Sequence, residues 1–272
     1  MPDVRVIVID GADDPRVAEY RDIGSHDALV TRGLFVAEGR LVVERLIDDR
    51  FQIRSLLLNR AALEAMQPRL ATLPRETSIF VGASEDFEAL TGYNIHRGCL
   101  ALAERPAPKL LDDLLFRAKS LILLEDVGNP DNIGGIFRNA AAFGAGAVVL
   151  NHGCADPLYR KAIRTSMAAT LRVPFTSVPF PDLWGAALSR VRAAGFQLIA
   201  LTPREDAVPI DEFVRSPREG RQALLLGTEG AGLSPDSETL ADARVRIPIS
   251  SAVDSLNVAV AAGIALHRLR QQ

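Results

Sequence analysis

Residues 121–150 read LILLEDVGNPDNIGGIFRNAAAFGAGAVVL, and this stretch decides the fold class. Residues 121–124 form a short apolar run that is typical of a strand buried on both faces, and residues 147–150 form another. Between them, residues 133–143 have a helical pattern, and Gly144 stands where a helix commonly ends. Two buried strands joined by a helix indicate a parallel pair within an α/β sheet.

The same alternation of strands and helices continues to the end of the chain. Short apolar runs predict strands at residues 196–201, 223–226 and 245–247. Helical patterns occupy residues 157–169, 182–194 and 255–269. The alternation predicts a mostly parallel, doubly wound sheet.

The first part of the chain predicts a second, smaller α/β domain. Its apolar runs predict strands at residues 33–39, 55–58, 78–81 and 98–103. The segments between these strands predict helices at residues 41–47, 61–70 and 84–90. Residues 104–109 contain two prolines, which favour extended backbone and indicate a linker. We therefore expect domains at 1–105 and 117–272, joined by a linker at 106–116.

Composition limits the class of protein. Of the 272 residues, 48% are hydrophobic, which excludes a disordered chain. The two cysteines form no CxxC pair and the four histidines lack metal-ligand spacing, so we expect neither a disulfide framework nor a metal site. No apolar run reaches the ~18 residues of a membrane span, and the first residues do not resemble a signal peptide. We therefore expect a cytoplasmic protein that does not enter a membrane.

The formal charge is nearly balanced, with a net value of −3 at pH 7. Such a balance argues against a protein that binds nucleic acid through bulk charge. A partner rich in phosphate would have to be held by individually placed arginines.

Three loops rich in glycine and amide side chains follow predicted strands. Parallel sheets bind ligands beyond the carboxyl ends of their strands, so the loops at 125–132, 226–232 and 247–257 mark a candidate site. Local structural roles fit some of the same residues. Asn132, Ser255 and Asn257 fit plain helix caps, and an ion pair between Arg138 and Glu229 would satisfy both charges. The loops contain neither GxxxxGK nor GxGxxG, which argues against a Rossmann-type dehydrogenase.

The three loops in order carry a resemblance to a known family. They contain Asn132-x-Gly-x-x-x-Arg138, then Leu-Gly-Thr-Glu-Gly-x-Gly-Leu at 226–233, then Ile-Pro-Ile and Ser-Leu-Asn-Val-Ala within 247–259. This set resembles the motifs of the SpoU/TrmH branch of the SPOUT methyltransferases, over about residues 117–272. The resemblance implies a parallel-sheet domain with a trefoil knot, and S-adenosylmethionine-dependent methylation of an RNA ribose 2′-hydroxyl. Phe-Val-Ala-Glu-Gly at 35–39 resembles the ribosomal-protein-like substrate-binding domain that many members carry.

The resemblance also implies roles for individual residues. The implied catalytic residues are Arg138, Asn132, Glu229, Ser255 and Asn257. The implied contacts of S-adenosylmethionine are Thr202, Gly227, Thr228, Gly230, Ile247 and Leu256. In the family, Arg138 is the proposed general base, although a guanidinium normally keeps its proton. The alternative is that Arg138 holds RNA phosphate and stabilises the forming alkoxide, while water takes the proton and Glu229 anchors the arginine.

RNA is the implied partner. Arg160, Lys161 and Arg164 have helical spacing and predict a basic edge near the site, although a solvated helix face fits the same pattern. Arg32 and Arg40 flank the Glu-Gly turn and are further candidates for RNA contact, although a plain surface position fits them as well.

The resemblance favours ribosomal RNA as substrate. A transfer RNA 2′-O-methyltransferase and a non-catalytic RNA-binding protein of the same fold are the alternatives. The family is typically a homodimer. The apolar residues Val258, Ala261, Ala262 and Ala265 of the last helix fit such an interface, and they fit a core equally well.

Overall fold

The computed structural model describes residues 5–21, 23–92, 98–216 and 220–270. The chain divides into two compact units. The N-terminal unit contains Met1–Pro106 together with Leu158–Ala168, and the C-terminal unit contains Ala107–Pro157 and Ala169–Gln272. The sequence predicts a single division near residue 105, whereas the chain also leaves the C-terminal unit for eleven residues, 158–168, before it returns.

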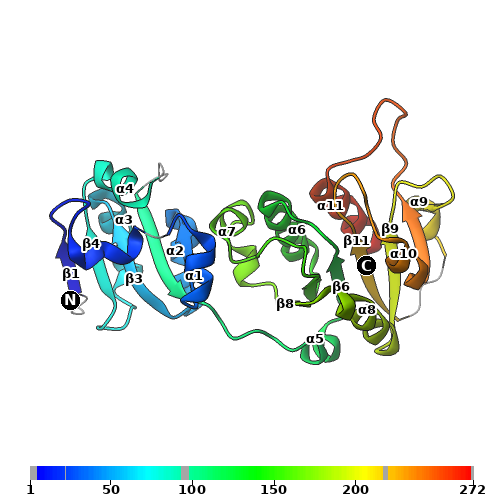
Figure 1. The fold of residues 1–272 in the computed structure, drawn as a ribbon, viewed down its shortest axis with the longest axis horizontal. Helices are drawn as coiled ribbons and strands as arrows, with labels where there is room; N and C mark the ends of the chain where they lie inside the picture. Colours follow the sequence, from blue (N-terminus) through cyan, green and yellow to red (C-terminus); the bar gives the residue numbers. More distant parts are fainter. Residues whose placement is uncertain (1–4, 22, 93–97, 217–219, 271–272) are drawn as a thin grey trace. The chain divides into compact units, whose positions relative to one another are not determined.

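The N-terminal unit is built on a mixed five-stranded sheet in the order β1-β4-β3-β5-β2 (Figure 1). The strands are β1 (Arg5–Val8), β2 (Leu34–Glu38), β3 (Ile53–Leu58), β4 (Ser78–Val81) and β5 (Cys99–Glu104). Strands β1, β4 and β3 are parallel, and β5 runs antiparallel to both β3 and β2.

The helices of this unit are α1 (His26–Thr31), α2 (Arg40–Asp48), α3 (Arg60–Leu70), α4 (Ser84–Thr91) and α7 (Arg160–Thr165). The four strands and three helices predicted between residues 33 and 104 are all present. The unit also contains β1, α1 and a 3-10 helix at Pro15–Tyr20, which the sequence patterns did not predict.

The C-terminal unit contains a seven-stranded sheet in the order β10-β12-β9-β11-β6-β7-β8. Its strands are β6 (Ser120–Leu124), β7 (Ala147–Leu150), β8 (Phe175–Ser177), β9 (Phe196–Leu201), β10 (Val208–Pro209), β11 (Arg221–Leu226) and β12 (Ala243–Arg246). Every pairing between these described strands is parallel. The predicted parallel sheet is therefore confirmed, and β8 and β10 are additional edge strands.

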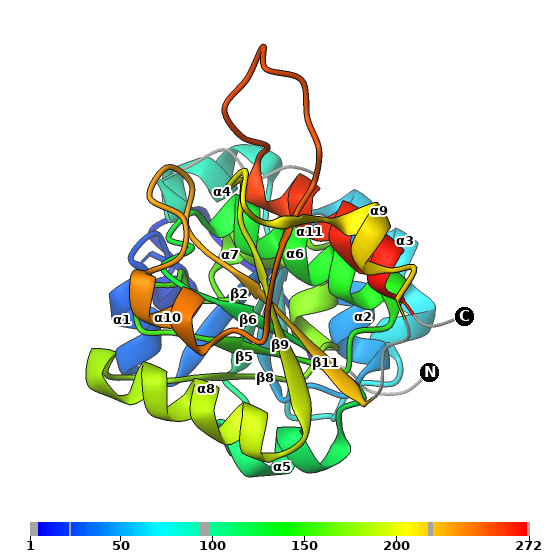
Figure 2. The same cartoon turned by 90° about the vertical axis from the view of Figure 1, so that its right-hand side faces the viewer.

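Helices cover both faces of this sheet. Alternate residues of each strand point to opposite sides, and the buried strands carry apolar side chains on both, so each face needs a cover. Leu121 and Leu123 pack in one core with Leu188, on the side of α5 (Leu111–Arg117) and α8 (Trp184–Ala193). On the other side lie α6 (Pro130–Phe143) and α11 (Val258–Leu269), as Figure 2 shows. Helices α6 and α11 approach closely, since a Cβ added at Gly135 of α6 would lie 2.8 Å from the Cβ of Ala259 in α11. The doubly wound arrangement that the sequence predicts is thus present.

The predicted helix at 157–169 is wrong in length. Helix α7 ends at Thr165, and the next 3-10 turn covers Ala169–Leu171. Met167 and Ala168 between them have φ values of 53° and 65°, which no α-helix contains. The carbonyl of Met167 accepts a hydrogen bond from Arg45 of α2, which holds this bend in the N-terminal unit.

Three local predictions also need correction. Helix α6 begins at Pro130 with Asn129 as its N-cap, so Asn132 lies inside the helix and does not cap it. Helix α11 begins at Val258 and not at residue 255, because the Asn257 side chain caps it. The segment predicted as a linker contains most of α5. Within the described residues, no helix is both long and apolar enough to span a bilayer.

Candidate active site

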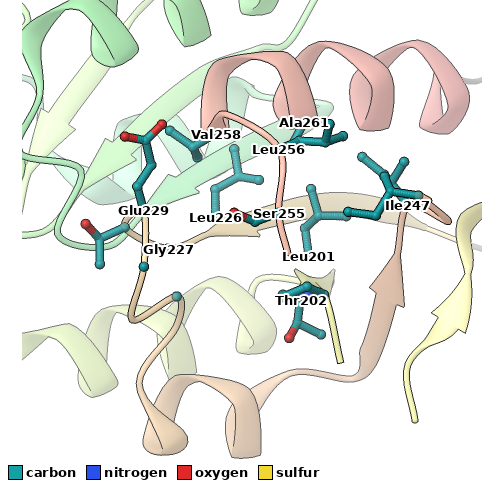
Figure 3. A pocket seen from close by; sticks show the side chains of 15 residues that line it. Leu201, Thr202, Leu226, Gly227, Glu229, Ile247, Ser255, Leu256, Val258 and Ala261 are labelled. Carbon is teal, nitrogen blue, oxygen red and sulfur yellow. The ribbon is translucent and has the colours of Figure 1, made fainter. Parts of the chain in front are cut away.

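A pocket opens at the carboxyl edge of the C-terminal sheet, where β9, β11 and β12 end (Figure 3). The side chains of Leu201, Leu226, Ile247 and Leu256 point toward one another and form its apolar wall. All six residues predicted to contact the cofactor line this pocket: Thr202, Gly227, Thr228, Gly230, Ile247 and Leu256. Parallel strands explain this grouping, since their carboxyl ends meet at one edge of the sheet although the segments are far apart in sequence.

Residues 227–233 form a tight turn, here called the glycine loop. Thr228 and Gly232 pair across it, and the backbone N of Gly232 donates to the carbonyl of Thr228 at 3.1 Å. A Cβ added at Gly227 would lie 2.3 Å from the carbonyl carbon and oxygen of Gly232. Only glycine therefore fits at 227, because the backbone of Gly232 and Leu233 at the exit of the loop occupies the space of a side chain.

Asn257 joins the three motif loops. Its Nδ2 donates to Oδ1 of Asn132 and to Oε1 of Glu229, each at 2.8 Å. Its Oδ1 accepts from the backbone N of Ala259 at 3.0 Å and of Val260 at 3.2 Å, which caps α11. Helix N–H groups require an acceptor and the two oxygens require a donor, so only this orientation of the amide satisfies all four contacts. Asn257 therefore has both of its predicted roles: its oxygen caps α11, and its nitrogen binds the other two motif residues.

Arg138 does not form the ion pair with Glu229 that the sequence analysis expected. Its side chain is exposed and, in the part of the chain that is described, has no hydrogen-bond or ion-pair partner. Glu229 instead accepts from Asn257. Arg138 lies six residues after Asn132 on α6, or about 9 Å along the helix axis. The charge of Arg138 is thus exposed to solvent.

The basic residues predicted near the site belong to the N-terminal unit. Arg160 and Arg164 of α7 form ion pairs with Glu38 at 3.5 and 3.6 Å, and the Glu38 side chain is only 2% exposed. Lys161 is half-buried on the same helix. Arg32 pairs with Glu19 and Arg40 with Glu44. Four of the five candidate RNA contacts therefore have carboxylate partners within this unit, which the sequence pattern did not predict.

Several residues of the pocket were missed by sequence reasoning. They are Leu201, Pro203, Gly232, Ile249, Val258 and Ala261, all of which line it. Each lies within three residues of a predicted motif residue or strand end, and this proximity was the signal that could have found them. Asn139 was also missed; its Nδ2 donates to the carbonyl of Ala259 at 2.7 Å and ties α6 to the start of α11.

The pocket fits S-adenosylmethionine in its chemistry. The apolar wall offers a surface for a flat base, and Thr202, Thr228, Glu229 and Ser255 place hydroxyl and carboxylate groups around it. The glycine loop presents backbone without side chains, which allows close approach of a ligand. Among the residues that the structure describes, no group of three or more His, Cys, Asp or Glu is arranged to hold a metal ion.

Comparison with known proteins extends these observations. A sequence profile of the SpoU rRNA Methylase family matches residues 119–267. A tRNA/rRNA methyltransferase of Mycobacterium bovis that is described as uncharacterized is 38% identical over 260 residues, which cover 94% of this chain and 88% of that protein. The 23S rRNA (guanosine(2553)-2'-O)-methyltransferase RlmP of Bacillus subtilis is 25% identical over 96% of this chain and 98% of its own.

Solved structures agree with the sequence comparison. The AdoMet-bound rRNA methyltransferase from Sinorhizobium meliloti has a TM-score of 0.80 at 25% identity, and the match covers 97% of both chains. The SpoU methyltransferase AviRb from Streptomyces viridochromogenes, in complex with AdoMet, has a TM-score of 0.75 at 26% identity over 94% of this chain and 97% of its own. The chain therefore belongs to the SpoU rRNA methylase family, and it is an S-adenosylmethionine-dependent enzyme that methylates ribose 2′-hydroxyls of RNA.

Proposed function

We propose that Arg138, Asn132, Glu229, Ser255 and Asn257 form the catalytic centre and that ribosomal RNA is the substrate. The observation that carries the first part is the amide of Asn257, which binds Asn132 of the first motif and Glu229 of the second at 2.8 Å. One side chain thereby fixes the relative positions of all three motif loops. Such mutual support is what preorganised sites require.

The residues of the chain bind, orient and stabilise. S-adenosylmethionine supplies an electrophilic methyl group on a sulfonium. Gly227, Thr228, Gly230, Ile247, Leu256 and Thr202 line the pocket that would hold this donor. Asn132 orients the ribose through the amide nitrogen that the Asn257 contact leaves free. Ser255 lines the pocket and is exposed, so its hydroxyl is available to an incoming nucleotide.

Arg138 acts as a fixed positive charge in this proposal. A guanidinium in contact with water keeps its proton, and Arg138 is exposed. It therefore holds an RNA phosphate and stabilises the negative charge that develops on the 2′-oxygen as the proton of the 2′-hydroxyl passes to water. This oxygen would accept the methyl group, and the donor would leave as a neutral thioether. The expectation that Glu229 anchors Arg138 is not retained, since Glu229 binds Asn257 instead.

Replacement of Arg138 tests this role. We expect Arg138→Ala to lower kcat by about 10²–10³ and to leave the Kd for S-adenosylmethionine unchanged. The matched control is Arg117→Ala, another exposed arginine of the same unit at the end of α5. Single-turnover methylation and calorimetric titration of the donor give the two quantities. Full turnover by Arg138→Ala would remove this residue from the mechanism.

Ribosomal RNA is favoured over transfer RNA by the nature of the relatives. RlmP of Bacillus subtilis, which is named for 23S rRNA, matches almost the whole length of the chain, including the N-terminal unit. We propose that this unit binds the RNA substrate. Mapping of 2′-O-methyl positions in ribosomal and transfer RNA, from cells with and without the protein, decides between the two substrates. A position lost only from transfer RNA would contradict the ribosomal assignment.

A homodimer is also proposed, with an interface that differs from the expected one. Val258, Ala262 and Ala265 are buried within the chain, and Ala261 lines the pocket. The apolar side chains that α11 exposes are Val260 and Ile264, at 52% and 37%. They are four residues apart and so share one face of the helix. Sedimentation of the wild type and of Val260→Lys tests the proposal, with a dimer and a monomer as the expected species.

Two further expectations remain proposals. One is the trefoil knot that the resemblance implies, which fits the parallel order of the C-terminal sheet. The other is a cytoplasmic location, which follows from an RNA substrate. Electron density for the segment between β12 and α11 would test the first, and fractionation would test the second.

A further inference from the structure

Glu125 is a buried acid to which none of the roles above is assigned. It directly follows β6, and 4% of its surface is exposed. Its Oε1 accepts a hydrogen bond from the backbone N of Ser234 at 3.3 Å, and Oε2 has no partner among the described residues. Burial of a carboxylate is unfavourable unless its contacts compensate, so the acid at this position needs a physical explanation.

Glu125 contacts both ends of the glycine loop. At the entry, its backbone N donates to the carbonyl of Leu226 at 2.9 Å. At the exit, its side chain accepts from Ser234, the residue after Leu233. The turn between these two contacts brings Gly227, Thr228 and Glu229 to the pocket. Glu125, at the end of β6, therefore joins the two ends of the glycine loop.

We propose that Glu125 is a positioning residue for the methyl donor. Its Oε1 holds the exit of the glycine loop against the end of β6, and this contact keeps the loop in the position that binds the donor. The inference deepens the proposed function, because the pocket it concerns is the one assigned to S-adenosylmethionine. Glu125 itself is absent from the lining of that pocket and acts through the loop.

Two variants separate the reach of this side chain from its charge. Glu125→Gln keeps the length and an acceptor oxygen but removes the charge. Glu125→Asp keeps the charge, but it is one methylene shorter, so its oxygen withdraws from the N–H of Ser234. If the hydrogen bond positions the loop, Asp raises the Kd for S-adenosylmethionine by about 5–10-fold and Gln changes it by less than about two-fold. In both variants, kcat at saturating donor stays at the wild-type value while the KM for the donor follows the Kd.

Thr176→Val is the matched control for stability. It removes a buried hydrogen bond of the same unit, from Oγ1 of Thr176 to the carbonyl of Lys109 at 2.6 Å, on the edge strand β8. We expect this variant to unfold at lower urea concentration and to bind the donor like the wild type. A purely structural role of Glu125 would give the same result for Glu125→Asp and would overturn the proposal. Donor binding by Glu125→Gln that is as weak as that of Glu125→Asp would overturn it as well.

A measurement without donor keeps this inference separate from the proposed function. Hydrogen exchange at the amide of Ser234 is expected to be slow in the wild type and in Glu125→Gln, and about five-fold or more faster in Glu125→Asp. Equal exchange in all three proteins would overturn the positioning role. Failure of the wild type to bind S-adenosylmethionine, with the exchange pattern intact, would overturn the proposed function alone.

Discussion

The two units each bury a glutamate at the end of a strand, and they hold the two carboxylates in different ways. Glu38 ends β2 of the N-terminal unit and is 2% exposed; Glu125 follows β6 of the C-terminal unit and is 4% exposed. Glu38 faces the guanidinium groups of Arg160 and Arg164, whereas Glu125 accepts one hydrogen bond from a backbone N–H. The first carboxylate is compensated by charge, and the second has one neutral donor among the described residues.

We infer that the buried Glu38 stabilises the fold, whereas the buried Glu125 orders the candidate site. Arg160 and Arg164 belong to a helix that is distant from Glu38 in sequence, so their ion pairs attach α7 to β2. Charge pairing is a suitable means of attachment, because a buried carboxylate strongly disfavours separation from its cations. Glu125 stands instead between two motif loops, and its weaker contact orders a turn that lines the pocket. We expect substitutions of Glu38 to affect stability and those of Glu125 to affect donor binding.

The largest expected effect comes from filling the glycine loop that Glu125 closes. In Gly227→Ala the new Cβ would lie 2.3 Å from the carbonyl atoms of Gly232, which are backbone and must shift. Overpacking of this kind costs about 1–3 kcal/mol, so the Kd for S-adenosylmethionine should rise by about 5–150-fold. Calorimetric titration of the donor measures the change.

Gly185→Ala is the control for this substitution. Gly185 lies in α8, and a Cβ there would meet nothing within 4 Å. We expect unchanged donor binding and a gain in stability of about 0.5–1 kcal/mol, because alanine favours the helix. Equal donor affinity of Gly227→Ala and the wild type would show that the glycine loop can change its conformation without weakening donor binding. That result would contradict the link between the Glu125 contact and the site.

The next largest effect concerns Glu38. Glu38→Gln removes the carboxylate beside Arg160, whose side chain is only 17% exposed, and should lower the free energy of unfolding by about 1–3 kcal/mol. A double-mutant cycle with Arg164→Met should give a coupling energy of about 0.5–1.5 kcal/mol in urea unfolding. Donor affinity should not change.

Glu19→Gln is the control for Glu38→Gln. Its carboxylate pairs with Arg32 and Arg54, but its side chain is 37% exposed. Exposed pairs contribute about 0–1 kcal/mol, so Glu19→Gln should cost less than Glu38→Gln. A smaller loss of stability in Glu38→Gln than in Glu125→Gln would break the distinction between the two buried acids.

A smaller effect is expected at Lys161, which has no carboxylate partner in the described chain, unlike its neighbours Arg160 and Arg164. Lys161→Ala should weaken RNA binding uniformly across sequences and reduce the slope of log K against log salt by about 1. Filter binding at several salt concentrations measures the slope, with Lys109→Ala as the control for an exposed lysine of the C-terminal unit. An unchanged slope would remove α7 from the RNA contacts.

A still smaller effect is expected from the pH dependence that Asp14 gives to stability; Asp14 is a third buried acid and, like Glu38, is compensated by arginine. Hydrogen bonds from Arg16 at 2.9 and 3.0 Å hold the pKa of Asp14 well below its usual range. A lowered pKa in the folded state stabilises the protein above the unfolded pKa of about 3.9, and this contribution is lost as the pH falls below that value. Asp14→Asn should therefore be less stable than the wild type at pH 7, and the gap should narrow toward pH 3.

Urea unfolding at pH 7, 5, 4 and 3 measures this gap. Asp13→Asn is the neighbouring control, since Asp13 is exposed and has no ion pair among the described residues. A gap of constant size across this range would contradict the role of the Arg16 contact.

Many strands and helices of the C-terminal unit could be predicted because each depends mainly on residues that are neighbours in the sequence. Apolar runs gave β7 and β9 with their observed bounds, and the glycine at 144 ends α6 in the left-handed conformation, at φ 75°. The candidate site could be assembled because carboxyl ends of parallel strands meet at one edge, whatever their separation in sequence. For this reason all six predicted cofactor contacts line one pocket.

The failures have a common physical cause. The expected Arg138–Glu229 pair was inferred from opposite charges, but Asn257 occupies the Glu229 carboxylate and Arg138 points to solvent. The helix expected at 157–169 was inferred from local pattern, but Met167 and Ala168 adopt positive φ where Arg45 binds the chain. In both cases a side chain more than 25 residues away determined the outcome, and local patterns contain no record of it.

The alternation of strands and helices, the parallel sheet and the three loops that carry the family motifs can all be read from the amino-acid sequence. These features depend on the periodicity of neighbouring residues and on the backbone preferences of glycine, proline and asparagine, which act over a few residues. The contacts between polar groups depend on the folded chain: Asn257 binds Asn132 and Glu229, Glu38 pairs with α7, and Glu125 binds the exit of the glycine loop. Hydrogen bonds and ion pairs act over about 3–4 Å, so they depend on how distant segments pack and not on their order along the chain.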